Sequence, residues 1–271
     1  MSDRVHRHEK TMLRLDMHWT RLFYSQLVAY CIVLAIWAIP LPNPVKLLAV
    51  TFHEASHALV ALLTGGRLFG FAIDPGGAGV TMGIGGNMTL ILLAGYIGSS
   101  LWGVLLYRIS VTWDSRYALL ALVLFVISSA LLGWLTEQTA LFGLGSLVLL
   151  VAMFKTPVWV QQFFLRLTGS ACCLYAPLEL LGEVVRFGAA PNVLGQETQS
   201  DIAQLALLWG IHRAIIGVAI LALQIALLVT LIRWTCNHGA RAALRAERAA
   251  RKRQKQALVE LFPEKKRYVI R

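Results

Sequence analysis

The feature that most constrains this chain is a series of long apolar runs, each close to the length that crosses a lipid bilayer. The runs cover residues 22–40, 45–63, 88–107, 117–135, 140–154 and 205–232. A spanning helix needs about 20 apolar residues, and the fifth run is short enough to tilt or to lie partly inside the protein. Charged residues make up only 14% of the 271 residues, too few to cover a soluble surface. We therefore expect an all-α polytopic membrane protein with about six transmembrane helices.

The segment between the second and third runs has no helical character. Two short β-prone stretches, residues 68–73 and 78–82, flank an Asp-Pro-Gly-Gly turn at residues 74–77. This pattern predicts a small β-hairpin after the second helix. Non-helical backbone at a membrane requires protein cover or a wet cavity, so we expect one of the two around the hairpin.

Two segments before the last run are harder to assign to a span. Residues 155–169 mix aromatic side chains with basic and amide side chains, which is typical of an interfacial amphipathic helix. Residues 170–188 are apolar but contain Glu179 and Glu183, which favours a segment that re-enters the membrane or lies along its surface. Residues 189–200 are predicted to form a loop.

The net charge of +11 is concentrated at the two ends of the chain. Basic residues beside apolar spans are an orientation signal and attract anionic lipid headgroups. Attachment to an apolar chain favours these headgroups over nucleic acid, so we expect no nucleic-acid partner. Two basic ends predict cytoplasmic termini and an even number of spans. We divide the chain into a cytoplasmic segment at residues 1–21, a membrane domain at 22–232 and a cytoplasmic tail at 233–271.

One motif in the second run carries chemistry: His53-Glu54-Ala55-Ser56-His57. Histidines four residues apart lie one turn from each other on one helix face, so both imidazoles can bind one Zn²⁺ ion. Glu54 lies about 100° around the helix, where a carboxylate can act as general base. Polar side chains at mid-span are costly in lipid, and a bound dication would compensate them. The alternative is a chance pattern without a metal.

A catalytic zinc site usually has three protein ligands, so a third must come from elsewhere in the chain. The candidates are Asp201, Glu179, Glu183, Asp74 and His212. Asp201 opens the last run, where it could equally be the N-cap of the last helix. His212 either contacts a metal ligand without binding the metal itself, or lies at the membrane interface. We favour the interface. The residues alone leave the third ligand open.

The motif and its surroundings resemble a known family. Residues 53–66, the Gly-rich hairpin and the Ala-Gly-Tyr-Ile-Gly sequence at residues 94–98 look like the bacterial M50B-like branch of the site-2 protease superfamily, which are intramembrane zinc metalloproteases. The resemblance is specific over residues 52–103 and looser to the end of the last run. It implies that Zn²⁺ is the cofactor, that the two histidines bind it, and that Glu54 is the catalytic base.

Two further expectations follow from the resemblance. A Ser-Asp pair of the family, followed by small and apolar residues, matches residues 200–203 and makes Asp201 the preferred third ligand. In site-2 proteases a hairpin near the site is thought to hold the substrate as an added strand, and the similar element here is at residues 69–82. The substrate-binding residues that this implies are Phe69, Phe71, Ile73 and Val80.

We therefore expect a zinc metalloprotease of a bacterial plasma membrane. It would hydrolyse a peptide bond in or near a transmembrane segment of another membrane protein, in a setting of regulated intramembrane proteolysis. One alternative is a membrane scaffold that keeps the fold without catalysis. Another is a metal transporter that uses the same histidine pair, but transport predicts polar groups along a path, whereas this chain clusters them at one depth.

Overall fold

A computed structural model describes residues 27–35, 37, 43–74, 77–112, 114–185, 192–193, 196–197, 200–230 and 233–234. The chain divides into one unit, Val28–Leu231, and a second formed by Met1–Leu27 and Ile232–Arg271. The fold below concerns the first unit. The predicted basic segment at residues 1–21 and nearly all of the tail at 233–271 lie outside the described residues, so the predicted division into three parts stays a prediction.

The first unit is mostly helical, as predicted. In chain order the described helices include α2 (Pro44–Leu63), α3 (Met88–Thr112), α4 (Ser115–Leu131), α5 (Glu137–Met153), α6 (Val158–Val185), α7 (Asp201–Trp209) and a last helix at Arg213–Thr230. By length and composition, α2, the Met88–Ser110 part of α3 and the last helix can each cross a membrane. The helices α4 and α5 are apolar but have 17 residues each. These helices are those of an integral membrane protein, while the number of six spans stays a prediction.

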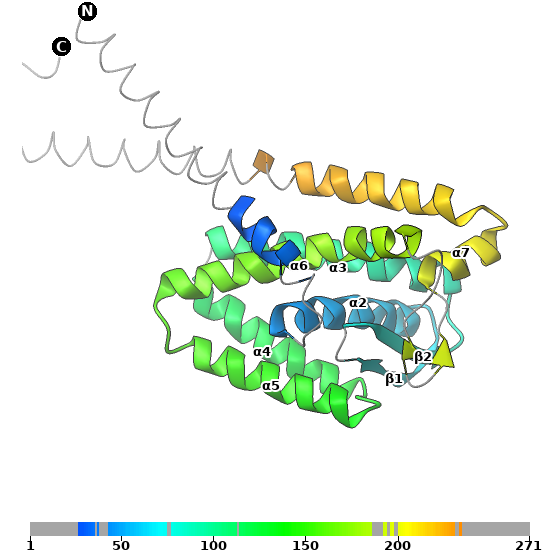
Figure 1. Ribbon diagram of the computed structural model, residues 1–271. Helices are drawn as coiled ribbons and strands as arrows, with labels where there is room; N and C mark the ends of the chain where they lie inside the picture. Colours follow the sequence, from blue (N-terminus) through cyan, green and yellow to red (C-terminus); the bar gives the residue numbers. More distant parts are fainter. Residues whose placement is uncertain are drawn as a thin grey trace, which may run out of the picture. The chain divides into compact units, whose positions relative to one another are not determined.

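The helix α2 lies at the centre of the unit. It begins where Asn43 Oδ1 accepts a hydrogen bond from Lys46 N at 2.7 Å, and Pro44 occupies the first helical position, where an N–H group is not needed. It contacts α3 and α6, and also α5 and both strands of the hairpin. Figure 1 shows α3 and α6 on one side of α2 and the α4–α5 pair with the strands on the other. The polar residues of α2 are therefore enclosed by protein.

Small residues bring α3 close to its neighbours. A Cβ atom built at Gly98 would collide with Ser56 of α2, and one at Gly103 would lie 2.6 Å from the carbonyl oxygen of Gly169 in α6. Helices in a membrane associate through such close packing, because lipid supplies no hydrophobic force between them. Through these glycines α3 packs closely against both α2 and α6.

The predicted hairpin follows α2. Strands β1 (Arg67–Ile73) and β2 (Gly79–Ile84) pair antiparallel, with an irregularity between Leu68 and Gly70. A second small antiparallel pair, β3 (Asn192–Val193) with β4 (Gln196–Glu197), lies in the segment that was predicted to be a loop.

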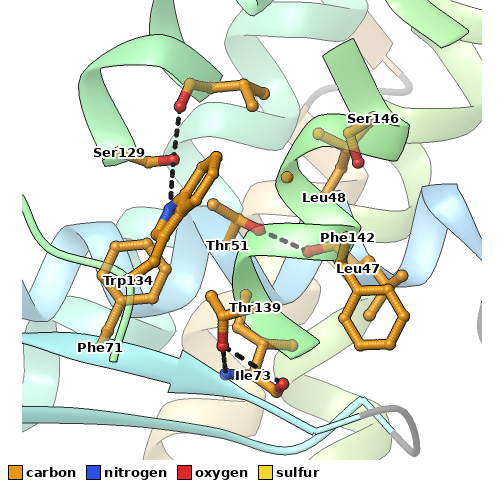
Figure 2. A pocket seen from close by; sticks show the side chains of 12 residues that line it. Leu47, Leu48, Thr51, Phe71, Ile73, Ser129, Trp134, Thr139, Phe142 and Ser146 are labelled. Atoms are coloured by element: carbon orange, nitrogen blue, oxygen red, sulfur yellow. Dashed lines mark hydrogen bonds between the residues drawn. The ribbon is translucent and has the colours of Figure 1, made fainter. Parts of the chain in front are cut away.

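The outer edge of β1 is bonded to the connection between α4 and α5. Phe71 N donates to Gly133 O at 2.9 Å, and Leu135 N donates to Phe71 O at 3.0 Å. Further along, Ile73 N donates to Thr139 Oγ1 at 2.8 Å. Ile73 and Thr139 both line a water-sized cavity of about 10 Å³, and Figure 2 shows the hydrogen bond between them. One edge of the sheet is thus occupied by the protein itself.

Two predicted segments differ from the structure. Residues 158–185 form the single helix α6, so the two segments that the sequence analysis treated separately, 155–169 and 170–188, are largely one continuous helix. The run at 205–232 is not one span, because Gly210 ends α7 in the left-handed conformation with φ 64° and its N–H bonds to Ala206 O. Glycine adopts this conformation without steric cost, which favours a break there.

Candidate metal centre

The side chains of His53 and His57 on α2 meet that of Asp201, which is distant from them in sequence. His53 Nε2 lies 3.0 Å from His57 Nε2, and Asp201 Oδ2 lies 3.2 Å from His53 Nε2 and 2.9 Å from His57 Nε2. Both histidines are buried and the Asp201 side chain is 19% exposed. Among the described residues, this is the one group of histidine, cysteine and carboxylate side chains suited to holding a metal ion. The structure thus brings together all three residues that the sequence proposed as ligands.

The hydrogen bond at Nδ1 of His57 determines which nitrogen of the neutral ring carries the proton. His57 Nδ1 lies 2.6 Å from the carbonyl oxygen of Ile91, which can only accept, so Nδ1 carries the proton and donates it. In the neutral ring, Nε2 then presents a lone pair toward His53 and Asp201. Metal-binding histidines commonly donate their second N–H group to a backbone carbonyl in this way.

The donor set fits a zinc ion. Acceptor atoms at separations of 2.9–3.2 Å repel one another unless a cation or a proton lies among them, and one proton can bridge only one pair. A tetrahedral Zn²⁺ with bonds of about 2.0–2.1 Å separates its ligand atoms by about 3.3–3.4 Å, just above the observed values. Two imidazoles and one carboxylate also form a recognised catalytic zinc set that leaves one position open.

The backbone of α3 presses directly on this triad. A Cβ atom built at Gly95 would collide with His57 Nε2 and lie 2.6 Å from His53 Cε1. The ring of His53 also packs edge-on against Tyr96, with 5.4 Å between centroids. The Nδ1 atom of His53 is buried and has no hydrogen-bond partner among the described residues. Such tight enclosure holds the imidazoles in place.

The start of α7 explains how Asp201 reaches the histidines. Ser200 is the N-cap of α7, because its Oγ accepts a hydrogen bond from Ala203 N at 3.2 Å. Asp201 is therefore the first helical residue, and its carboxylate turns toward His53 and His57. The alternative prediction, that Asp201 itself caps the last helix, is wrong.

The rest of α7 fixes its position against the bundle. Ile202 and Leu205 are buried, and α7 packs on α3. Near the end of the helix, Trp209 Nε1 donates to Thr89 Oγ1 on α3 at 3.3 Å. These contacts hold the first turn of α7, and Asp201 with it, over α2.

Glu54 is buried and held by β2. Thr81 Oγ1 donates to Glu54 Oε2 at 2.6 Å and lies 3.1 Å from the backbone carbonyl oxygen of Glu54. A Cβ atom at Gly79, two residues earlier on the same face of the strand, would collide with the Glu54 carboxylate. The strand thus accommodates the carboxylate with a glycine and binds it with a hydroxyl.

The other candidate ligands lie elsewhere or outside the description. Asp74 is at the turn of the hairpin and does not join the triad. His212 is exposed, and its Nδ1 accepts a hydrogen bond from Ala214 N at 3.3 Å at the start of the last helix, a capping role that the sequence did not suggest. Glu179 and Glu183 lie on α6, but their side chains are outside the described part of the chain.

The four predicted substrate-binding residues have different environments. Phe71 and Ile73 are buried in the core; the backbone of Phe71 bonds to the α4–α5 connection, and that of Ile73 bonds to Thr139 at the start of α5. Val80 is half-buried on β2, and the side chain of Phe69 is 58% exposed. Their role in substrate binding stays a prediction.

The sequence did not indicate four residues that shape the site: Thr81, Gly79, Gly95 and Ile91. A threonine in a β-prone run gives no sign of a partner on a helix. Gly95 lies in the stretch that resembles the family, but the resemblance gave no physical reason for a glycine at this position. Ile91 contributes a backbone carbonyl, so its side chain carries no signal.

Two buried histidines and a carboxylate beside apolar helices form a candidate site for a divalent metal in a membrane protein. The model of the Peptidase M50B-like family matches residues 26–231. The chain belongs to this family, which confirms the resemblance found in its sequence and implies a membrane metallopeptidase. No curated protein and no solved structure matches the chain.

Proposed function

We propose that the protein is an intramembrane zinc metalloprotease that hydrolyses a peptide bond in or near a transmembrane segment of another membrane protein. The observation that carries the proposal is the triangle of His53, His57 and Asp201 donor atoms, with sides of 2.9–3.2 Å, inside a membrane-type helical unit. The adjacent buried Glu54 adds the group that a metallopeptidase needs for proton transfer.

Each residue of the site has a role in this proposal. His53, His57 and Asp201 would hold the Zn²⁺ ion, which when bound supplies Lewis-acid chemistry and makes water a better nucleophile. Glu54 would accept a proton from the attacking water and return it to the leaving amine. Glu54 is buried, and the low dielectric of such a site strengthens the electrostatic interactions of its carboxylate.

The hairpin offers a place for the substrate. A peptide bond within a helix is accessible only after the helix unwinds, and the unwound backbone needs hydrogen-bond partners. The outer edge of β1 is bonded to the α4–α5 connection, so the edge available for strand addition is that of β2. Phe69, exposed on β1, and Val80, on β2, would then contact substrate side chains. The buried Phe71 and Ile73 would support the sheet from inside.

The proposed setting is a bacterial plasma membrane with both termini in the cytoplasm. The concentration of basic residues at the two ends supports this orientation and contact with anionic headgroups. Cleavage of a membrane-tethered factor, as in regulated intramembrane proteolysis, is the setting that family membership favours.

Two alternative functions make different predictions. A scaffold without catalysis would not require a buried carboxylate beside the metal site. A transporter would require metal-binding groups along a path, but one such group is found within the part of the chain that the structure describes. Metal flux into vesicles would distinguish transport from proteolysis.

The test is cleavage by purified protein of two probes: fluorophore-labelled casein in detergent, and a single-span reporter with a helix-breaking Gly-Pro pair in vesicles. We expect the wild type to cleave at least one probe, and Glu54→Gln to lose about 10²–10⁴-fold in rate while keeping its zinc. If zinc-loaded wild type cleaves neither probe, or if Glu54→Gln cleaves equally well, the proposal is wrong.

A further inference from the structure

We propose that Thr81 is a positioning residue that links a substrate strand, bound at the open edge of β2, to Glu54. The inference rests on the proposed proteolytic function and adds to it a residue outside the metal-binding motif. Two independent observations carry it: the contact made by the Thr81 side chain and the direction of the Thr81 backbone groups.

The side chain of Thr81 is bound to Glu54. Its hydroxyl donates a hydrogen bond to Glu54 Oε2 at 2.6 Å. A hydrogen bond to a charged acceptor is stronger than one between neutral groups, so it can fix the orientation of the carboxylate. Without Thr81, no described residue supplies a hydrogen bond to either carboxylate oxygen of Glu54.

The backbone of Thr81 points the other way, to the free edge of the sheet. Opposite residues in an antiparallel pair alternate between pairs that exchange two hydrogen bonds and pairs that exchange none. Thr81 lies opposite Phe71, whose N–H and C=O both bond to the α4–α5 connection. The Phe71–Thr81 pair therefore exchanges no hydrogen bonds, and the N–H and C=O groups of Thr81 point away from β1.

The next pair along the strand agrees with this assignment. Ile73 lies opposite Gly79, and Ile73 N bonds to Thr139 Oγ1 instead of to β2. Gly79 and Thr81 thus both offer backbone groups to the open edge, and within the described residues neither has a backbone partner outside the sheet. Only Thr81 of the two has a side chain, so it alone can bind Glu54.

These directions give Thr81 two contacts at once. A substrate strand added to β2 would lie about 4.8 Å from β2. It would exchange two hydrogen bonds with the Thr81 backbone. The hydroxyl of the same residue holds Glu54. One residue would therefore both dock the extended substrate and orient the general base. This would align the scissile peptide with Glu54.

The test compares Thr81→Val, which keeps the shape but removes the hydroxyl, with Thr81→Ser, which keeps the hydroxyl. With the cleavable probe described above, we expect Thr81→Val to lower kcat about ten- to a hundredfold, the scale of one hydrogen bond to a charged group. KM should stay within about twofold, because the backbone groups that dock the strand are intact. Thr81→Ser should restore most of kcat.

A second measurement separates docking and metal binding from catalysis. A photo-crosslinking amino acid at Met82, whose side chain is exposed, reports substrate docking in chelator-treated protein that cannot turn over. Thr81→Val and wild type should crosslink the reporter equally and should bind equal zinc after reloading.

The inference is overturned if Thr81→Val retains the wild-type kcat. It is also overturned if Thr81→Val loses zinc or crosslinking to the same degree as activity, which would indicate a structural role. Failure of the proposed function gives a different result, since the wild type itself would then show no cleavage that depends on Glu54.

Discussion

The candidate site has two halves that both include residues of the segment 53–57 of α2 but are held by different parts of the chain. The metal half consists of His53, His57 and Asp201, and its two ends are 148 positions apart in the sequence. The base half consists of Glu54, Thr81 and Gly79, and its hydrogen bond joins residues 27 positions apart. The metal half depends on α3 and α7, whereas the base half depends on the hairpin.

The difference teaches that metal binding and proton transfer can be damaged separately. A change on α3 or α7 should remove the metal from a folded protein. A change on β2 should leave the metal in place and impair turnover. Two glycines, Gly95 against the metal half and Gly79 in the base half, make this comparison direct.

The largest expected effect follows Gly95→Ala. The added methyl group would collide with His57 Nε2, so α3 or the imidazole must move and the triangle of donor atoms opens. We expect loss of zinc and of all zinc-dependent cleavage, measured by metal analysis of the purified protein. Gly145→Ala on α5, where no described atom lies within 4 Å of the new Cβ, is the control and should retain its zinc. Equal zinc in the two variants would contradict the geometry of the metal half.

A smaller effect is expected from Gly79→Ala in the base half. The new Cβ would displace the Glu54 carboxylate, so cleavage should fall about 10²-fold or more, within the range of general-base catalysis. Zinc content should stay at the wild-type level. Loss of zinc from this variant would show that the two halves are not separable.

The smallest effect is expected from Thr89→Val, which removes the hydrogen bond between Trp209 and α3. This bond holds the C-terminal end of α7, and Asp201 is at the N-terminal end of the same helix. One neutral hydrogen bond contributes about 0.5–1.5 kcal/mol, so zinc affinity should weaken by roughly two- to tenfold, measured by competition with a chelator. Unchanged affinity would mean that the buried residues of α7 position Asp201 without help from Trp209.

The sequence predicted the parts of this molecule that repeat a local pattern. The apolar runs predicted the positions of α2 to α5 within a few residues, and the Asp-Pro-Gly-Gly turn predicted the hairpin. The spacing of His53 and His57 placed both on one face of α2, because the helical repeat alone determines that relation.

The parts that it missed depend on contacts between distant segments. Nothing local distinguishes Gly210, which breaks the last run, from Gly169, which lies inside α6 against α3. The position of Asp201 depends on the packing of α7, and the bond from Thr81 to Glu54 depends on how the hairpin lies on α2. Such information is in the tertiary fold and not in the periodicity of the residues.

The central claim is that His53, His57 and Asp201 together form the metal centre. The most direct test is the zinc content of gently purified wild type beside His57→Ala and Asp201→Ala, with circular dichroism to confirm that each variant is folded. The account predicts about one zinc ion per wild-type chain and its loss from both folded variants. Wild type without zinc, or Asp201→Ala with full zinc at wild-type affinity, would contradict it.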